Sequence, residues 1–382
     1  MLLTLLTLLT VSRSHAFGYL WVMLQFLTIL WCISLAVLTI YHFVVFRIRM
    51  KENELNISED FPGVSVVIAV KNGSVQLIEN IGSIIAQEYP LFEMIIINDY
   101  SSADEKMKLE ELTKRSPKII LYHNQEKPGK KQALSLGIEK ASHPFILCTD
   151  ADCRPSTTAW IKSMVAQSEG NKMVLGYSPY VEEKGLLNLY IRFETVMTAI
   201  QYFSWTMLGK PYMGVGRNML YPRNLFQQSN PYEHSNIPYG DDDLWVQKTS
   251  TITTVEANLD NASFVYSDPP QSWSEWMKQK HRHMSAGHHY DKKVLWQPGL
   301  YGLALIMNWF LFPFLVLGSM LNWITGLFLA GLFIRWITYA AWTKKLGDSD
   351  TVVWYPFLEL GYALYLGGMG IFTAVVKKKT WN

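Results

Sequence analysis

The residues best suited to chemistry follow a short apolar run from Phe145 to Cys148. Asp150 and Asp152 stand just beyond this run, one residue apart. The run has the length of a buried strand, and carboxylates at a strand end can hold Mg²⁺ or Mn²⁺ against a phosphate. If the extended geometry continued through the pair, both side chains would point to one face. An Asp-x-Asp triplet alone is not specific, and the alternative is a solvated strand end that caps the next helix.

Alternating strands and helices would place this pair at one edge of a sheet. Apolar runs predict strands at 64–70, 92–97, 118–122, 144–149 and 173–177, and helical spacing predicts helices at 75–88, 104–115 and about 130–140. Such alternation is typical of an α/β domain with a mostly parallel sheet and helices on both faces. Ligands bind beyond the carboxyl ends of such strands, where Asp99, Asp150 and Asp152 would all lie.

A family resemblance rests on four segments, which occur in the order VSVVIAVKN, QEYPLFEMIIINDYSSADE, PGKKQALSLGI and FILCTDADC. Their order and spacing resemble the nucleotide-binding half of family 2 glycosyltransferases, distantly of the cellulose-synthase type. The resemblance implies a Rossmann-like GT-A fold. It also implies a nucleotide-diphosphate sugar as donor, most simply a UDP-sugar, and Mg²⁺ or Mn²⁺ as cofactor.

The resemblance also assigns roles within these segments. Asp99 would contact the nucleotide base or ribose, although Asn98 stands where the family usually has a further Asp. Lys130 would face the diphosphate, and its charge suits that task; without the resemblance it reads equally as a surface lysine at a helix start. Asp152 would be the metal ligand, and Asp150 would approach both the ribose and the metal.

Two later segments extend the resemblance toward the acceptor. Arg217 and Asn218 stand in a Gly-Arg-Asn segment that resembles the acceptor-side lining of the family. The run Asp241-Asp242-Asp243 stands where the family has an acidic pair that supplies the general base. We predict that Asp242 is the base and that Asp241 is the next candidate. The alternative is a charged helix N-terminus, where carboxylates are favourable in any case.

Residues 271–290 predict a helix that lies in the membrane interface, because Trp273 and Trp276 occur there together with cationic residues. Gln279 and Arg282 resemble the family's Q-x-x-R-W motif, which helps to hold donor and acceptor. His283 replaces the Trp of that motif, which argues against processive polymerisation. The histidines of this stretch fit a solvated basic helix better than a metal site; they are His281, His283, His288 and His289.

The N-terminal part predicts a membrane anchor. Residues 17–46 contain no charged side chain and are long enough to span a bilayer. Arg47, Arg49 and Lys51 follow this stretch, so the positive-inside rule places the α/β domain in the cytoplasm, at the inner (cell) membrane. A second apolar stretch, 186–208, contains Arg192 and Glu194 and is predicted as an amphipathic helix packed on the domain.

The C-terminal part predicts further membrane segments. Residues 300–334 fit two spans with a turn near 318–322, followed by the basic residues Arg335, Lys344 and Lys345. Residues 352–376, interrupted by Pro356 and Glu359, form a third span or a re-entrant segment. The predicted organisation is an anchor at 1–50, a GT-A domain at 60–270, an interfacial helix at 271–298 and a multi-pass membrane region at 299–382.

These patterns together predict an enzyme of the cell membrane. A net charge of +2 gives no electrostatic basis for nucleic-acid binding. We expect inverting, metal-dependent transfer of a sugar from a nucleotide-diphosphate sugar to a lipid-linked or glycan acceptor, in cell-surface polysaccharide or glycolipid synthesis. One alternative is a metal-dependent phosphoryl or nucleotidyl transferase, since Asp pairs and lysines serve that chemistry too. Another is an inactive membrane scaffold, favoured by the changed family positions 98 and 283.

Overall fold

The computed structural model describes residues 2–48, 61–169, 171–228, 241–286, 290–319 and 322–375. The chain divides into two compact units. The helical unit comprises Met1–Arg47, Trp296–Ala341 and Val352–Asn382, and the sheet unit comprises Ile48–Leu295 and Trp342–Thr351. Residues 342–351 thus belong to the sheet unit, whereas the sequence predicts a membrane region over all of 299–382.

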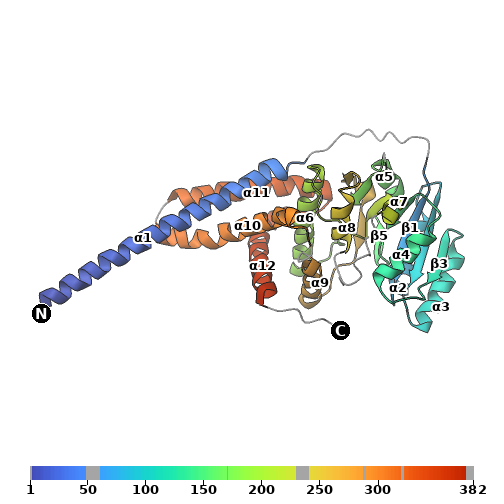
Figure 1. The fold of residues 1–382 in the computed structure, drawn as a ribbon, viewed down its shortest axis with the longest axis horizontal. Coiled ribbons are helices and arrows are strands. Elements are labelled where there is room, and N and C mark those ends of the chain that lie inside the picture. The colour runs from blue at the N-terminus through green and yellow to red at the C-terminus, as the bar shows by residue number, and fades with distance from the viewer. Residues whose placement is uncertain are drawn as a thin grey trace. The chain divides into compact units, whose positions relative to one another are not determined.

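The centre of the sheet unit is a seven-stranded sheet with the order β3-β2-β1-β4-β7-β6-β8 (Figure 1). Its strands are β1 (Val64–Val70), β2 (Phe92–Asn98), β3 (Ile119–His123), β4 (Phe145–Cys148), β6 (Met173–Gly176), β7 (Met219–Pro222) and β8 (Val255–Asn258). Strand β7 runs antiparallel to β4 and β6, and the other pairings are parallel. The predicted mostly parallel sheet is confirmed. Because β7 is reversed, the residues before it lie at the edge where the parallel strands end.

Helices cover both faces of this sheet, and the central strand β1 is apolar on both sides to pack against them. Val66 and Ile68 share a core cluster with Leu77 of α2 (Ser74–Ile85). The alternate residue Val67 faces α4 (Lys130–Lys140), where a methyl group on Gly137 would come within 2.6 Å of it. Successive side chains of a strand point to opposite faces, so this alternation explains the continuous apolar run.

The predicted helices are present with shifted ends. Helix α2 ends at Ile85, three residues before the predicted end, and α3 (Ala103–Leu112) passes into a 3-10 turn over Thr113–Arg115. Helix α6 (Leu186–Met207) packs within the sheet unit as expected. Its buried residues include Arg192 and Glu194 and are not confined to one stripe, so the predicted amphipathic pattern is wrong.

The remaining elements of the unit are α5 (Trp160–Ala166), α7 (Arg223–Gln228), α8 (Asp241–Thr249), α9 (Trp273–Ala286), β5 (Cys153–Pro155) and β9 (Val265–Ser267).

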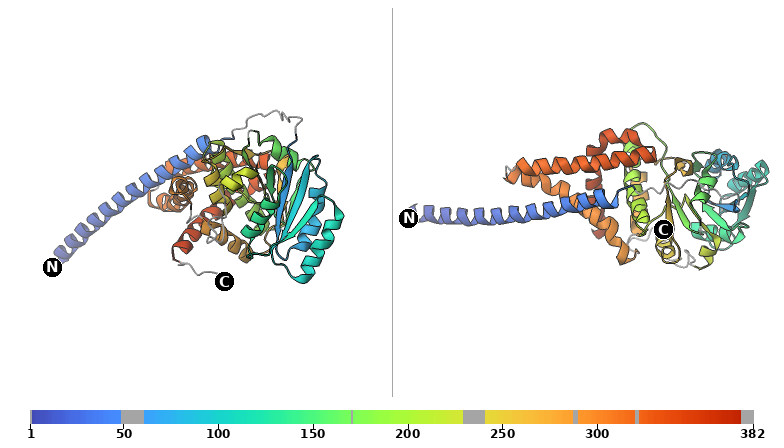
Figure 2. Two further views of the ribbon diagram at one scale, coloured as in Figure 1. Left: turned by 45° about the vertical axis from the view of Figure 1, so that its right-hand side comes forward. Right: turned by 90° about the horizontal axis from the view of Figure 1, so that it is seen from above.

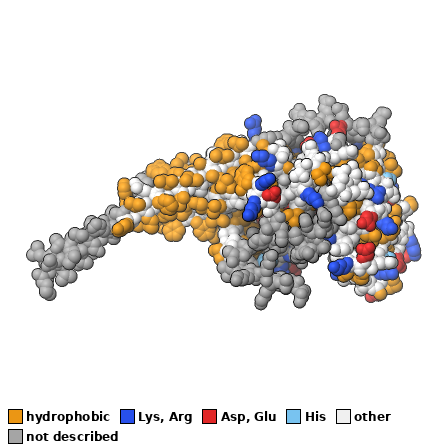
Figure 3. Space-filling model, in the orientation of Figure 1, with side chains coloured by type: hydrophobic (Ala, Val, Ile, Leu, Met, Phe, Trp, Pro, Cys, Tyr) orange, Lys and Arg blue, Asp and Glu red, His pale blue; other side chains and the backbone are white. Residues whose placement is uncertain are grey.

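The helical unit consists of α1 (Leu2–Ile40) with a π-helical end over Tyr41–Val45, α10 (Lys292–Ser319), α11 (Asn322–Leu346) and α12 (Tyr355–Val375). Helix α1 runs beside α10 and α11 (Figure 2), where Trp31, Leu315 and Phe328 share a core cluster. Among the residues that the structure describes, three segments are long and apolar enough to cross a membrane: Tyr19–Val45, Lys292–Gly318 and Trp323–Leu346. Hydrophobic side chains dominate the visible surface of this unit (Figure 3).

Two predictions about charged residues in this unit are wrong. Arg335 does not follow a span as a flanking charge, because it lies inside α11 with its side chain 1 % exposed. Glu359 does not interrupt the last apolar block, because α12 is continuous from Tyr355 to Val375. The two side chains form a buried ion pair, with 2.8 Å between Arg335 Nε and Glu359 Oε1. Each charge is therefore compensated within the helical unit.

Candidate active site

The carboxylate pair lies in a turn that follows β4. The strand ends at Cys148, and Ala151 and Asp152 form the turn, so the pair is not part of the strand. Even so, ligand atoms of Asp150, Asp152 and Cys153 lie within 4.8 Å of one another. Burial raises the pKa of the Cys153 thiol, which is therefore protonated and a poor ligand. The two carboxylates remain as hard oxygen donors, the set that Mg²⁺ and Mn²⁺ prefer, so the site fits such an ion.

Lys130 is paired with the first of these carboxylates. It is the first residue of α4, and its Nζ lies 2.6 Å from Asp150 Oδ1. Burial by itself would lower the pKa of Lys130, but attraction to Asp150 and then to Asp242 raises it overall. Burial would raise the pKa of Asp150, and Lys130 holds it below the usual value. Both groups are therefore ionised at neutral pH, and the Lys130 side chain is 57 % exposed and open to an anion.

Asp99 holds the loop that leads to Lys130. It follows β2 and is buried. Its Oδ2 accepts a hydrogen bond from the Gly129 N–H at 2.9 Å, and its Oδ1 accepts one from Asn124 Nδ2 at 2.8 Å. The neighbouring Asn98 contacts His123 through its amide nitrogen, at 3.0 Å from Nδ1. In this structure Asp99 therefore ties the end of β2 to the start of α4.

Two of the three consecutive aspartates at the start of α8 have different surroundings. Asp242 lies over Gly216, where an added methyl group would come within 2.0 Å of its Oδ2. Its charge raises the pKa of Lys130, which links it electrostatically to the carboxylate pair. Asp243 instead accepts hydrogen bonds from the Gly214 N–H at 3.3 Å and from the Tyr290 hydroxyl. The side chain of Asp241 lies outside the described residues.

Arg217 joins the site from the residues before β7. Its guanidinium lies over the Tyr180 ring at 4.9 Å from the centroid, and its Nη2 donates to the Ser178 carbonyl at 2.9 Å. Its charge lowers the pKa of Asp150, after the larger effect of Lys130. The buried Arg217 Nε has no hydrogen-bond partner among the described residues, which suits an anionic ligand.

Asn218 and Gln279 hold neighbouring parts of the site together. Asn218 is fully buried, and its amide donates to the carbonyls of Tyr177 and Ser263, both at 2.8 Å. Gln279 on α9 donates to the Tyr180 hydroxyl at 3.0 Å. Arg282, one turn further along α9, has an exposed side chain. Tyr180 was not predicted, because a tyrosine after a strand carries no sequence signal without its partners Arg217 and Gln279.

Helix α9 differs from its prediction at one tryptophan. Trp276 is only 2 % exposed and lies edge-on to the Tyr190 ring of α6 at 5.4 Å, so it is a core residue of the sheet unit and not a membrane anchor. Trp273 is 46 % exposed. His288, His289 and the side chain of His283 lie outside the described residues. Within the described ranges, the metal-ligand cluster found is the Asp150, Asp152 and Cys153 group.

Comparison with known proteins finds similarity to glycosyltransferases. The sequence profile described as Glycosyl transferase family 2 matches residues 65–228. A poly-beta-1,6-N-acetyl-D-glucosamine synthase of Staphylococcus aureus is 32 % identical over 130 residues, which are 33 % of this chain and 30 % of that protein. An uncharacterized glycosyltransferase of Haemophilus influenzae is 32 % identical over 126 residues, 32 % of this chain and 38 % of that protein. The chain thus spans about a third of the length of these curated relatives.

A solved structure extends the likeness to the fold. It is the mannosyltransferase PcManGT from Pyrobaculum calidifontis in complex with GDP-Man and Mn²⁺, with a TM-score of 0.56 at 14 % identity. The match covers 86 % of this chain and 97 % of that one. The profile match spans the segments that carry Asp99, Lys130, Asp150 and Asp152. Residues 65–228 thus match the glycosyl transferase family 2 profile, and the sheet unit that contains them has the GT-A fold.

Proposed function

We propose that this protein transfers a sugar from a nucleotide-diphosphate sugar to a lipid-linked or glycan acceptor at the membrane, with inversion at the anomeric carbon. The observation that carries the proposal is the Asp150–Asp152 pair with the Lys130 ammonium bonded to it, together with the Asp242 carboxylate, whose charge acts on Lys130. A divalent ion, a cation for a leaving diphosphate and a base for an acceptor are the groups that such a transfer needs.

The donor side would use the residues around β4. Asp150 and Asp152 would hold Mg²⁺ or Mn²⁺, which supplies positive charge opposite the departing diphosphate. Lys130 would exchange its bond to Asp150 for one to a phosphate oxygen, since its side chain is 57 % exposed and its ammonium binds a carboxylate of the proposed metal site. Asp99 would position the nucleotide, directly or by fixing the Gly129 loop that it binds.

The acceptor side would use Asp242. Its carboxylate would take the proton of the acceptor hydroxyl while the acceptor oxygen bonds to the anomeric carbon and the bond to the diphosphate breaks. The products would be the glycosylated acceptor and a nucleoside diphosphate. A lipid-phosphate acceptor would depend less on Asp242, because a phosphate oxygen is already nucleophilic. The apolar helices of the helical unit support an acceptor that arrives from the bilayer.

A substitution of Asp242 tests this proposal. Asp242→Asn keeps the size and polarity of the side chain but removes its ability to accept a proton. We expect transfer to a hydroxyl acceptor to fall by roughly 10²–10⁴-fold, the usual contribution of a positioned base. Binding of the nucleotide with Mn²⁺ should be nearly unchanged, because Asp99, Lys130, Asp150 and Asp152 remain. Asp241→Asn is the matched control and should have the smaller effect.

The assay uses the full-length protein in membranes with a panel of UDP- and GDP-sugars, and follows release of nucleoside diphosphate. If the single variants Asp241→Asn and Asp242→Asn each keep wild-type activity, the three-aspartate run is not the source of the base. In a parallel assay with nucleoside triphosphates in place of the sugar nucleotides, release of pyrophosphate would favour the nucleotidyl-transferase alternative. If no sugar nucleotide is consumed, the scaffold alternative stands.

A further inference from the structure

The segment Trp342–Thr351, here called the connector, joins α11 to α12 yet belongs to the sheet unit. It begins in the last turn of α11, which ends at Leu346. Gly347 follows with φ +91°, a conformation that glycine adopts without strain, and so turns the chain away from the helix axis. Trp342, Thr343 and Leu346 are all fully buried. The connector is therefore anchored in the sheet unit by these buried side chains, while Gly347, Ser349 and Asp350 are exposed.

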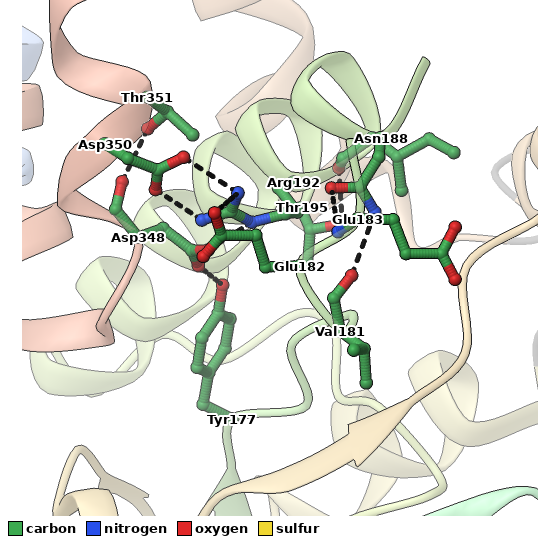
Figure 4. Close-up of polar contacts among 11 residues, drawn as sticks. Tyr177, Val181, Glu182, Glu183, Asn188, Arg192, Thr195, Asp348, Asp350 and Thr351 are labelled. Atoms are coloured by element: carbon green, nitrogen blue, oxygen red, sulfur yellow. Dashed lines mark hydrogen bonds and ion pairs between the residues drawn. The ribbon is translucent and has the colours of Figure 1, made fainter. Parts of the chain in front are cut away.

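A buried arginine of α6 binds the connector (Figure 4). Arg192 is 4 % exposed, and its Nε lies 2.8 Å from Asp348 Oδ1. Its Nη1 donates to Asp350 Oδ2 at 2.9 Å, and Nη2 binds the other oxygen of the same carboxylate. Burial would lower the pKa of Arg192, and the two aspartates raise it overall. A guanidinium buried this deeply depends on these carboxylates, and removal of either side leaves an uncompensated charge.

The same contact continues toward the active site through Tyr177. The Tyr177 hydroxyl donates to Asp348 Oδ2 at 3.2 Å (Figure 4). Tyr177 follows β6, and its carbonyl accepts the Asn218 amide at 2.8 Å. The next residue, Ser178, accepts from Arg217, whose charge acts on Asp150. Hydrogen bonds at Tyr177 and at the adjacent Ser178 thus connect the connector to Asn218 and Arg217.

We infer that Arg192 and Asp348 are positioning residues: they hold the connector against Tyr177 and thereby fix Ser178, Arg217 and Asn218 at the acceptor side of the active site. The expected effect on catalysis rests on the proposed function. The physical coupling between the connector and residues 177–181 does not. The connector, which is continuous with α11 and α12 of the helical unit, would in this way set the geometry of the active site in the sheet unit.

The test replaces Arg192 in the full-length protein and measures amide hydrogen exchange and transfer separately. Arg192→Gln should speed exchange in two segments, 343–351 and 177–181. Transfer should fall by about 10- to 100-fold, the cost of a misplacement near 1 Å in an active site. Affinity for UDP with Mn²⁺ should change by less than about twofold, since Lys130, Asp150 and Asp152 are untouched.

Three further variants serve as controls. Arg192→Lys keeps the charge but not the bidentate geometry and should fall between wild type and Arg192→Gln. Asp350→Asn alters the more exposed carboxylate, 47 % exposed, and should change transfer little because Asp348 remains. If Arg192→Gln fails to fold, Arg192→Gln with Asp348→Asn removes both buried charges and preserves a group that can accept from Tyr177.

The readouts separate this inference from the proposed function. Hydrogen exchange needs no donor or acceptor, so it reports on the coupling even if no sugar nucleotide is consumed. Faster exchange in 343–351 alone, or unchanged protection of 177–181, would overturn the inference. So would wild-type transfer by a folded Arg192→Gln protein that shows faster exchange in both segments.

Discussion

Asp152 is the exposed member of the carboxylate pair, whereas Asp150 is engaged by Lys130. The two carboxylates therefore differ in their surroundings although they stand one residue apart. A metal ion would take its free ligand from Asp152 and would share Asp150 with the lysine. This division makes Asp152 the more direct test of metal binding, because its replacement leaves the Lys130–Asp150 pair intact.

We predict that Asp152→Ala abolishes the Mn²⁺-dependent part of UDP binding, since one carboxylate alone is a weak site for a hard cation. Calorimetry with UDP, in the presence and absence of Mn²⁺, measures the effect. Asp104→Ala is a control, because Asp104 is an exposed carboxylate in the first turn of α3. Unchanged metal-dependent affinity in Asp152→Ala would mean that the ion, if one binds, is held elsewhere.

At the scale of elements, the loop before β7 and the start of α8 approach each other closely. Gly216 has no side chain at the point where Asp242 rests, and a β-carbon there would lie 2.0 Å from Asp242 Oδ2. Such a distance cannot be accommodated without displacement of the carboxylate. The position of the proposed base thus depends on a glycine in a different element.

Gly216→Ala should therefore lower transfer to a hydroxyl acceptor by about 10-fold or more through displacement of Asp242. Nucleotide binding with Mn²⁺ should persist, which distinguishes the variant from an unfolded protein. Gly82→Ala on α2 is the matched control, because an added methyl there meets nothing within 4 Å. Normal transfer rates in Gly216→Ala would show that Asp242 does not need its observed position.

The pairing of α11 with α12 gives a second prediction at this scale. Glu359 accepts hydrogen bonds from Arg335, from Trp309 Nε1 at 3.0 Å and from the Tyr355 hydroxyl at 2.5 Å. Arg335→Met should destabilise the protein by about 3–5 kcal/mol, because it leaves a buried carboxylate without its cation. Thermal unfolding in detergent measures this loss. The double variant Arg335→Met with Glu359→Gln should recover part of it; no recovery would contradict the ion-pair explanation.

At the scale of the whole molecule, the chain leaves the sheet unit at Leu295 and returns to it at Trp342. Two candidate spans, Lys292–Gly318 and Trp323–Leu346, lie across this interval. Two crossings return the chain to the side from which it started. The connector and the catalytic site should therefore lie on the same side of the membrane, and the basic residue Arg47 after the first span favours the cytoplasm.

We predict that cysteines introduced at Glu183 and at Ser349 both resist an impermeant thiol reagent in intact cells and both react after permeabilisation. Both positions are exposed, and of the native cysteines Cys148 and Cys153 are buried. Labelling of both sites in intact cells would reverse the orientation and remove access to cytosolic sugar nucleotides. Labelling of only one site would contradict the assignment of the connector to the sheet unit.

The sequence by itself determined five strands of the large sheet, β1, β2, β3, β4 and β6, together with the order of the site segments and the apolar helices, because these depend on local patterns. Strands β7 and β8 were not predicted. An apolar run followed by Asp150 and Asp152 predicts a strand with two carboxylates just beyond its carboxyl end, whichever strands lie beside it. The same holds for the apolar, uncharged stretches that became α1, α10 and α11. Each of these signals lies within about 30 residues of chain, the range over which hydrophobic periodicity acts.

Only the tertiary structure decided which charged and aromatic residues meet. Arg192 and Asp348 are 156 positions apart, and nothing in either neighbourhood identifies the other as its partner. Trp276 was mistaken for a membrane anchor and Arg335 for a flanking charge, because an exposed and a buried side chain look alike in sequence. Whether such a residue faces lipid, water or a partner depends on packing between distant segments, and local composition does not contain that information.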